Sequence, residues 1–118
     1  MSSKILLVDE DILLREVLGE FLTSGGYEVD VVKDSKQALK ILEPGKYGLA
    51  LIDQDMKQMD GLQVVKQIRK QDKNVFCLIM TGYTSLDKVN SGIEKGSSDY
   101  IIKPFPMPEL LNIIQQHI

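Results

Sequence analysis

Five polar residues of this sequence stand at the ends of short apolar runs, where side-chain chemistry could be concentrated. They are Asp9, Glu10, Asp53, Thr81 and Lys103. Apolar runs of this length suit strands that are buried on both faces of a parallel sheet, and such sheets bind ligands beyond the carboxyl ends of their strands. The positions therefore predict one crevice that holds three carboxylates, a hydroxyl and an ammonium group.

Three carboxylates in one crevice repel one another. Two like charges about 4 Å apart cost roughly 4 kcal/mol at an effective dielectric constant of about 20. Protonation, a bound cation or the Lys103 ammonium can neutralise this repulsion. Mg2+ suits the site best, because it prefers oxygen ligands and accepts a few carboxylates together with water and phosphate. A phosphoryl group contacted by Thr81 and Lys103 is the natural further ligand.

The composition argues against several other kinds of chemistry. His117 is the only histidine and Cys77 the only cysteine in 118 residues. A Ser-His or Cys-His catalytic pair, a zinc site and an internal disulfide are therefore not expected. The sequence has no Gly-rich phosphate-binding motif, and its net charge of −3 gives no basis for direct nucleic-acid binding. No apolar run approaches the roughly 20 residues that span a bilayer, so no membrane contact is expected.

The elements that must position these residues alternate between strand and helix five times. Strands are predicted at residues 4–8, 27–32, 48–52, 75–80 and 100–102. Helices are predicted at residues 11–24, 34–42, 60–70, 84–95 and from about 106 to 118. The alternation predicts one α/β domain with a five-stranded parallel sheet and helices on both faces. A strand order of 2-1-3-4-5 makes the first and third strands neighbours, and so brings the three carboxylates together.

Hydrophobic periodicity predicts which side of each helix is buried. In the first helix the predicted buried face consists of Ile12, Leu13, Val17, Leu18, Phe21 and Leu22. The helix at 84–95 is predicted to be the least stable, because a glycine inside a helix costs about 1 kcal/mol relative to alanine. His117 is expected to be solvated.

Four stretches of the sequence resemble the signature segments of response-regulator receiver domains. They read ILLVDEDILLREVL, LALIDQDMKQMDGLQVVKQIR, CLIMTGY and DYIIKPF, and they cover essentially the whole chain in order. One stretch alone is weakly specific, whereas the four together are highly specific. The resemblance implies a chemotaxis-regulator-like protein with the flavodoxin-like fold and a role in two-component phosphorelay signalling.

The resemblance also implies a role for each residue in the crevice. Asp53 is the phosphoacceptor and a metal ligand, Asp9 and Glu10 are the acidic pair that helps to bind Mg2+, and Asp55 lends its backbone carbonyl to the metal. Thr81 hydrogen-bonds a phosphoryl oxygen and moves on activation.

Two further roles concern the fifth strand. Lys103 pairs first with Asp53 and later with the phosphoryl group, and its peptide bond to Pro104 is typically cis. Tyr100 stands where a switch aromatic turns inward once Thr81 moves.

The sequence departs from the family pattern around the same crevice. Glu10 stands where Asp is commoner, and Lys57 stands where Pro is common, which implies a more mobile loop after Asp53. Gln54 and Asp55 are more polar than the usual pair at their positions. None of these departures removes a group that the chemistry requires.

The function that these features imply is a signalling switch and not a multiple-turnover enzyme. A histidine kinase or phosphotransfer protein donates to Asp53, and the modified domain controls a downstream effector domain or protein. The face formed by residues 84–118 is the expected readout surface and permits a homodimer. The alternatives are a haloacid-dehalogenase-like small phosphatase that uses Asp53 and Asp55, and an interaction module that is never phosphorylated.

The organisation of the chain is expected to be simple. Residues 1–118 form one receiver domain, which is either a stand-alone regulator or a fragment of a longer one, with the fragment slightly favoured. The N-terminus enters an apolar run without the layout of a signal peptide, and this, with the single cysteine, predicts a cytoplasmic location.

Overall fold

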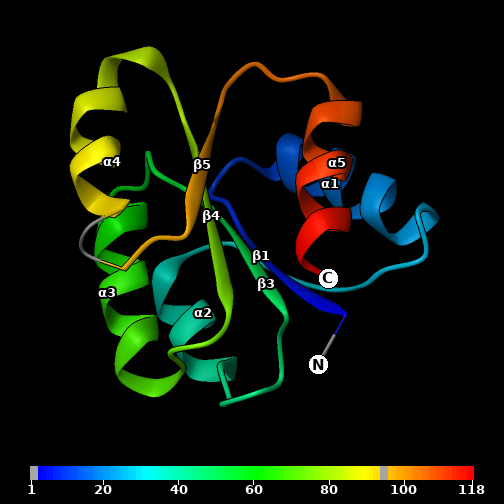
Figure 1. Cartoon of the computed structure of the whole chain (residues 1–118), viewed down its shortest axis with the longest axis horizontal. Helices are drawn as coiled ribbons and strands as arrows, with labels where there is room; N and C mark the ends of the chain where they lie inside the picture. The colour runs from blue at the N-terminus through cyan, green and yellow to red at the C-terminus, as the bar shows by residue number, and fades with distance from the viewer. Residues whose placement is uncertain (1–2, 94–95) are drawn as a thin grey trace.

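Five parallel strands form one sheet in the order β2-β1-β3-β4-β5 (Figure 1). The computed structural model describes residues 3–93 and 96–118. The strands are β1 (Lys4–Val8), β2 (Glu28–Val32), β3 (Leu49–Asp53), β4 (Phe76–Thr81) and β5 (Asp99–Ile102). The predicted fold class and strand order are therefore confirmed.

Helices cover both faces of the sheet, as Figure 1 shows. They are α1 (Ile12–Ser24), α2 (Ser35–Ile41), α3 (Gly61–Gln71), α4 (Leu86–Ile93) and α5 (Met107–His117), with a short 3-10 turn, η1 (Tyr83–Ser85), before α4. One apolar core lies between the sheet and α1 and α5, and a second lies between the sheet and α2, α3 and α4. Strands β1, β3 and β4 are buried on both faces along most of their length, because their apolar side chains enter the two cores.

Aspartates start the first three helices. Asp11, Asp34 and Asp60 are the N-caps of α1, α2 and α3, and each carboxylate accepts a hydrogen bond from a backbone N–H of the first turn. At α3 the Gln63 side chain also accepts from the Asp60 N–H, which completes a capping box. The caps fix where each helix begins relative to the strand before it.

Three sequence-based predictions were wrong in detail. Ile12, Leu13 and Val17 do not face the core, because α1 is rotated so that Leu18 and Leu22 are its buried residues. The segment predicted as one helix at 84–95 begins as η1, and residues 94–95 lie outside the described residues. His117 is half-buried, with its ring stacked on Phe76 at a centroid distance of 3.7 Å.

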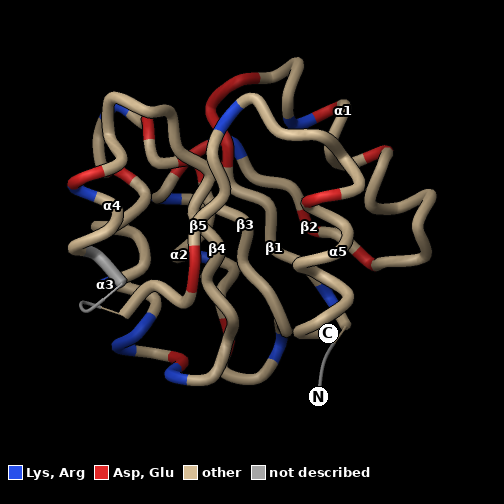
Figure 2. The backbone as a smooth tube through the Cα atoms, turned by 45° about the horizontal axis from the view of Figure 1, so that its top comes forward, with Lys and Arg blue, Asp and Glu red and all other residues tan. Residues whose placement is uncertain are grey.

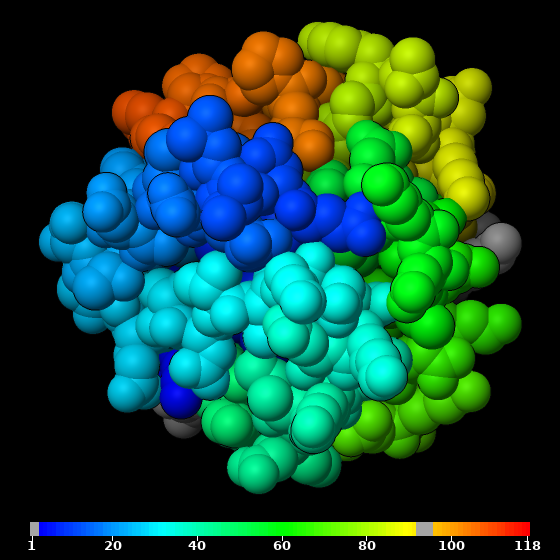
Figure 3. All heavy atoms as spheres, turned by 180° about the vertical axis from the view of Figure 1, so that it is seen from behind, coloured from blue at the N-terminus to red at the C-terminus, as the bar shows by residue number. Residues whose placement is uncertain are grey.

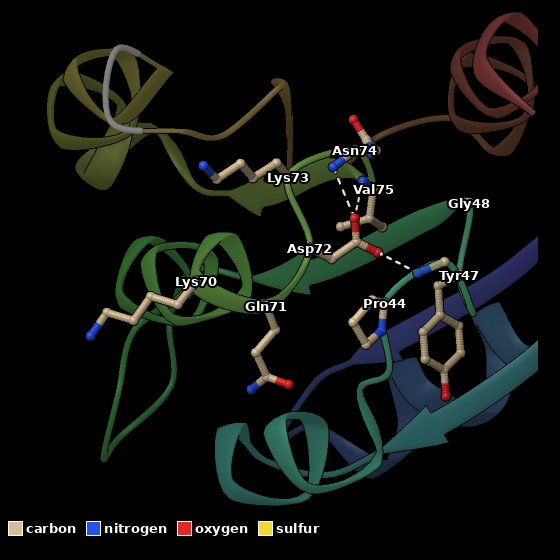
Figure 4. Close-up of a pocket in the computed structure, with 10 residues that line it drawn as sticks. Pro44, Tyr47, Gly48, Lys70, Gln71, Asp72, Lys73, Asn74 and Val75 are labelled. Atoms are coloured by element: carbon tan, nitrogen blue, oxygen red, sulfur yellow. Dashed lines mark hydrogen bonds between the residues drawn. The ribbon is translucent and has the colours of Figure 1, made fainter.

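Asp72 organises the amino-terminal edge of the sheet, which is opposite to the predicted crevice. Its carboxylate accepts hydrogen bonds from the backbone N–H groups of Gly45, Asn74 and Val75, and so joins the loops before β3 and β4 (Figure 4). A hollow of about 540 Å3 lies beside these loops. Burial raises the pKa of Asp72, but the three N–H donors and the charge of Arg69 outweigh it, and the net pKa is lowered.

No helix in the described part of the chain is both long enough and apolar enough to cross a bilayer.

Replacing Asp72 with Ala should lower the free energy of unfolding by about 2–3 kcal/mol at pH 7, because three backbone N–H groups lose their acceptor and that of Val75 is buried. The lowered pKa means that this stabilisation is present above the unfolded-state pKa and is lost as the pH falls through the folded-state pKa. Urea unfolding at pH 7 and pH 3 measures the difference. Lys73→Ala is the control on the same loop and should change stability by no more than about 0.5 kcal/mol. An Asp72→Ala loss that is equal at both pH values would contradict the carboxylate's role.

Candidate functional site

The carboxyl ends of β1, β3, β4 and β5 meet at one edge of the sheet, where the predicted crevice lies. In Figure 2 acidic segments gather at this edge beside a basic one. β1 and β3 are neighbours, so Asp9 comes close enough to Asp53 for the two charges to interact. Asp53 and Thr81 are the last residues of their strands, one position further into the sheet than predicted.

Asp53 and Lys103 form the central contact of the crevice. The Lys103 Nζ lies 2.8 Å from Asp53 Oδ1, and the Asp53 side chain is almost completely buried. Burial lowers the pKa of Lys103, but its bond to Asp53 and the charges of Asp53, Asp9 and Asp55 outweigh it and raise the net pKa. Lys103 is therefore a fixed cation that holds one oxygen of the buried carboxylate.

Asp9 carries the least satisfied carboxylate of the crevice. Its Oδ1 accepts from the Asp11 N–H at 2.9 Å, whereas Oδ2 is buried and has no hydrogen-bond partner. Burial is the main cause that raises the pKa of Asp9 to about 6, and the nearby charge of Asp53 adds to it. A buried, unpartnered carboxylate oxygen beside a second carboxylate is an environment that a hard cation would relieve.

The Glu10 carboxylate is turned to a different partner. Its Oε1 accepts from the backbone N–H of Lys57 at 3.0 Å, and the Arg15 guanidinium donates to the carbonyls of Asp9 and Glu10. As the described side chains lie, no three of the His, Cys, Asp and Glu residues form a group that could hold a metal ion. The structure thus brings Asp9 and Asp53 together, while Glu10 is held by the loop after β3.

That loop, residues 54–60, depends on two residues that sequence reasoning did not assign to the site. Gln54 is buried, and its side-chain oxygen accepts from the Leu62 N–H at 3.0 Å. Gly61 packs so closely that a Cβ there would lie 2.8 Å from the Asp53 carbonyl oxygen. The signal for Gly61 was its place just after a capping aspartate, in a tight strand-to-helix connection.

Asp55 lies at the start of the loop, and its backbone and side chain have different partners. Its N–H donates to Asp53 Oδ1 at 3.2 Å, and its exposed carboxylate accepts from the Ser85 hydroxyl of η1. The Asp55 side chain is therefore occupied outside the crevice, and this does not favour a role as the acid/base partner of Asp53.

Thr81 and Tyr100 lie on the two strands at the far side of the crevice. Thr81 is fully buried, and its hydroxyl donates to the Gly82 carbonyl. Its own carbonyl accepts from the Lys103 N–H at 2.7 Å, which fixes β5 against β4 where the site begins. Tyr100 is half-buried against the core under α2, α3 and α4. The Lys103–Pro104 peptide bond is cis, as the resemblance implied.

A flavodoxin-like sheet whose carboxyl edge holds a buried aspartate bonded to a lysine, beside a second buried aspartate, defines the receiver class of signalling domains. The model of the response regulator receiver domain matches residues 5–115, and the chain belongs to this family. The match does not support the haloacid-dehalogenase-like phosphatase that was considered as an alternative.

Individual relatives agree with this assignment. The response regulator protein FleR of Pseudomonas aeruginosa is 35% identical over 99% of this chain, which spans 25% of FleR. The Vibrio cholerae chemotaxis protein CheY4 superposes with a TM-score of 0.87 at 29% identity, with full coverage of both chains. The receiver domain of the sensor histidine kinase PA1611 of P. aeruginosa, solved with a magnesium ion in its active-site cleft, has a TM-score of 0.85 at 30% identity over 99% of this chain and 98% of its own.

The unpartnered carboxylate predicts that Asp9→Asn stabilises the metal-free protein by about 1–3 kcal/mol at neutral pH. Because the folded-state pKa of Asp9 is raised to about 6, its contribution to stability is present below about pH 4 and is lost as the pH rises through about 6. The gain from Asp9→Asn should therefore shrink toward zero as the pH falls from 7 to 4.

Guanidinium unfolding in EDTA across this pH range measures the effect. Asp11→Asn is the matched control, since asparagine caps a helix as well as aspartate does and Asp11 is exposed. A destabilised Asp9→Asn protein at pH 7 would show that the carboxylate is satisfied in the fold.

Proposed function

We propose that this chain accepts a phosphoryl group on Asp53 from a phosphohistidine of a histidine kinase or phosphotransfer protein. The phosphorus–nitrogen bond of the donor breaks and a phosphorus–oxygen bond to the Asp53 carboxylate forms. The modified domain then changes conformation and controls a downstream effector domain or protein. The chain spans about a quarter of FleR, so the identity of the effector belongs to the proposal as well.

The observation that carries this proposal is the contact between Lys103 and Asp53. The ammonium group donates to Oδ1 at 2.8 Å, which fixes the direction of the carboxylate and places a positive charge beside it. The same ammonium is near enough to neutralise the oxygens of a phosphoryl group on Asp53 after transfer. Lys103 thus serves the acceptor before transfer and the product after it.

Mg2+ is the proposed cofactor, with Asp9, Asp53 and the Asp55 backbone carbonyl as its ligands and Glu10 as a further acidic group. Support comes from the unpartnered Asp9 Oδ2 and from the magnesium ion in the related PA1611 domain. When bound, Mg2+ supplies charge neutralisation for the carboxylates and for the incoming phosphoryl oxygens. Asp9 and Asp53 would hold the cation between them, while Lys103 keeps its bond to Oδ1 of Asp53.

The proposed switch runs from Thr81 into α4 and across to Tyr100. Gly82 alone separates Thr81 from η1. Ser85 of η1 donates to Asp55, and Lys88 of α4 forms an ion pair with Asp60 at 2.6 Å. A phosphoryl oxygen that draws the Thr81 hydroxyl from the Gly82 carbonyl would pull on the start of η1. The surface of α4, β5 and α5 is the proposed readout face, which also permits a homodimer.

Treatment with acetyl phosphate and Mg2+ should add one phosphoryl group to the wild-type chain and none to Asp53→Asn. The reason is that only a carboxylate can form the acyl phosphate. Intact-mass measurement with and without Mg2+ reads the result, and turnover of a generic phosphate ester is assayed in parallel. An adduct that persists in Asp53→Asn, or steady ester hydrolysis, would overturn the proposal. Absence of any adduct would instead favour the unphosphorylated interaction module.

An apolar patch beside the crevice offers a docking surface for the phosphodonor. It consists of Ile12, Leu13 and Val17 of α1 and Val31 of β2, of which Leu13 is 68% exposed and Ile12 is 62% exposed. The patch begins three residues after Asp9, so a partner seated on it lies next to the acceptor. An exposed group of large apolar side chains on a small domain is typical of an interaction site.

The donor in this test is a histidine phosphotransfer protein that modifies the wild-type chain. Leu13→Ser should slow phosphotransfer from this donor by about tenfold or more, which corresponds to roughly 1.4 kcal/mol of lost binding energy. The rate with acetyl phosphate should not change, because Leu13 does not touch the acceptor. Lys36→Ser, an exposed substitution on α2, serves as the control and should leave both rates unchanged. Equal slowing with both donors would mean that Leu13 supports the site's structure and not docking.

A further inference from the structure

The hydrogen bond between Glu10 and Lys57 joins two loops that are 47 residues apart in the sequence. Figure 3 shows the segment after β1, in blue, directly against the segment after β3, in green. The bond uses a side-chain carboxylate on one loop and a backbone N–H on the other, at 3.0 Å. It therefore depends on the residue types at both positions.

Both residue types are departures from the family pattern, and they fit each other. Position 10 carries a glutamate, whose side chain has one methylene more than that of aspartate. The longer side chain lets the carboxylate extend to the neighbouring loop. The donor at position 57 exists only because the residue is not proline, which has no backbone N–H. A proline at position 57 would leave the Glu10 carboxylate without this partner.

We propose that the Lys57 N–H competes with the bound cation for the Glu10 carboxylate, and so lowers the affinity of this chain for Mg2+. The proposal rests on the proposed function in one respect, namely that a divalent cation binds beside Asp53. In the structure Asp9 and Asp53 interact, Asp9 Oδ2 is unpartnered, and Glu10 is the acidic group that is engaged elsewhere. The bond through Oε1 turns the Glu10 carboxylate toward the loop after β3, so a cation beside Asp9 and Asp53 recruits Glu10 at the expense of this bond.

The size of the effect follows from the exposure of this bond. Lys57 is exposed and Glu10 is half-buried, so water replaces the broken bond at moderate cost. A hydrogen bond of this kind corresponds to about a 3- to 10-fold change in an equilibrium constant. The predicted change in Mg2+ affinity is of that order.

The test compares Lys57→Pro with Lys57→Ala by Mg2+ titration of the unphosphorylated full chain, followed through amide chemical shifts in NMR spectra. Both variants remove the lysine charge, but only Lys57→Pro removes the N–H. We expect Lys57→Pro to bind Mg2+ about 3- to 10-fold more tightly than Lys57→Ala. In the Glu10→Ala background the two substitutions should give the same affinity.

A second measurement avoids any change in loop conformation that proline introduces. In the metal-free wild type the Lys57 amide should exchange with solvent more slowly than in Glu10→Ala, and Glu10→Gln, which keeps an acceptor oxygen, should retain the protection. Saturating Mg2+ should speed exchange at Lys57 in the wild type. The Gly61 amide, which donates to the Gln54 carbonyl in the same loop, is the internal control and should not accelerate.

The outcomes separate this inference from the proposed function. Equal affinities of Lys57→Pro and Lys57→Ala, or exchange at Lys57 that stays slow with Mg2+, would show that Glu10 keeps its bond and would overturn the competition. Absence of Mg2+ binding by the wild type would instead remove the cation from the proposed function.

Discussion

The contact between Lys103 and Asp53 is the interaction on which the rest of the site depends, and it exists only because three strands keep their register. β4 lies between β3 and β5, so Lys103 must reach across one strand to meet Asp53. The Gln54 N–H donates to the Met80 carbonyl and the Lys103 N–H donates to the Thr81 carbonyl, at 2.8 and 2.7 Å. These two bonds continue the ladder past the strand ends. A shift by one residue would send either side chain to the opposite face.

Two buried aspartates at opposite edges of the sheet show how the fold separates stability from function. Asp72 has three backbone N–H donors, and its pKa is lowered although burial alone would raise it. Asp9 has one donor and an unpartnered oxygen, and its pKa is raised to about 6. The first aspartate is satisfied by the two loops that it joins, whereas the second keeps one buried oxygen that the fold does not satisfy. An unsatisfied polar group at the edge of the sheet where Asp53 lies is expected of a site whose ligand supplies the missing partner.

The fold and the positions of Asp53, Lys103 and Asp9 could be predicted from sequence, because each of these residues lies at or just after a strand end. A hydrophobic pattern with a period of two residues indicates a strand, and one with a period of 3.6 residues indicates a helix. Together with the parallel order of the strands, these patterns are enough to place Asp9, Asp53 and Lys103 at the carboxyl edge of the sheet. The buried face of α1 could not be predicted in the same way, since apolar residues occur on more than one side of the helix and only packing selects Leu18 and Leu22. The partner of Glu10 could not be predicted either, because it depends on the path of a loop, and no periodicity describes that path.

The departures from the family pattern are concentrated in that loop and on the residue that binds it. The Gln54 side chain accepts from α3, the Asp55 carboxylate accepts from η1, and the Lys57 N–H donates to Glu10. The loop is thereby connected to the helix after it, to the segment that follows Thr81 and to the acidic pair. None of these bonds involves Lys103 or changes the strand end that carries Asp53. The contact between Asp53 and Lys103 is therefore set by the register of the sheet, whereas the partners of Glu10 and Asp55 are set by the path of the loop.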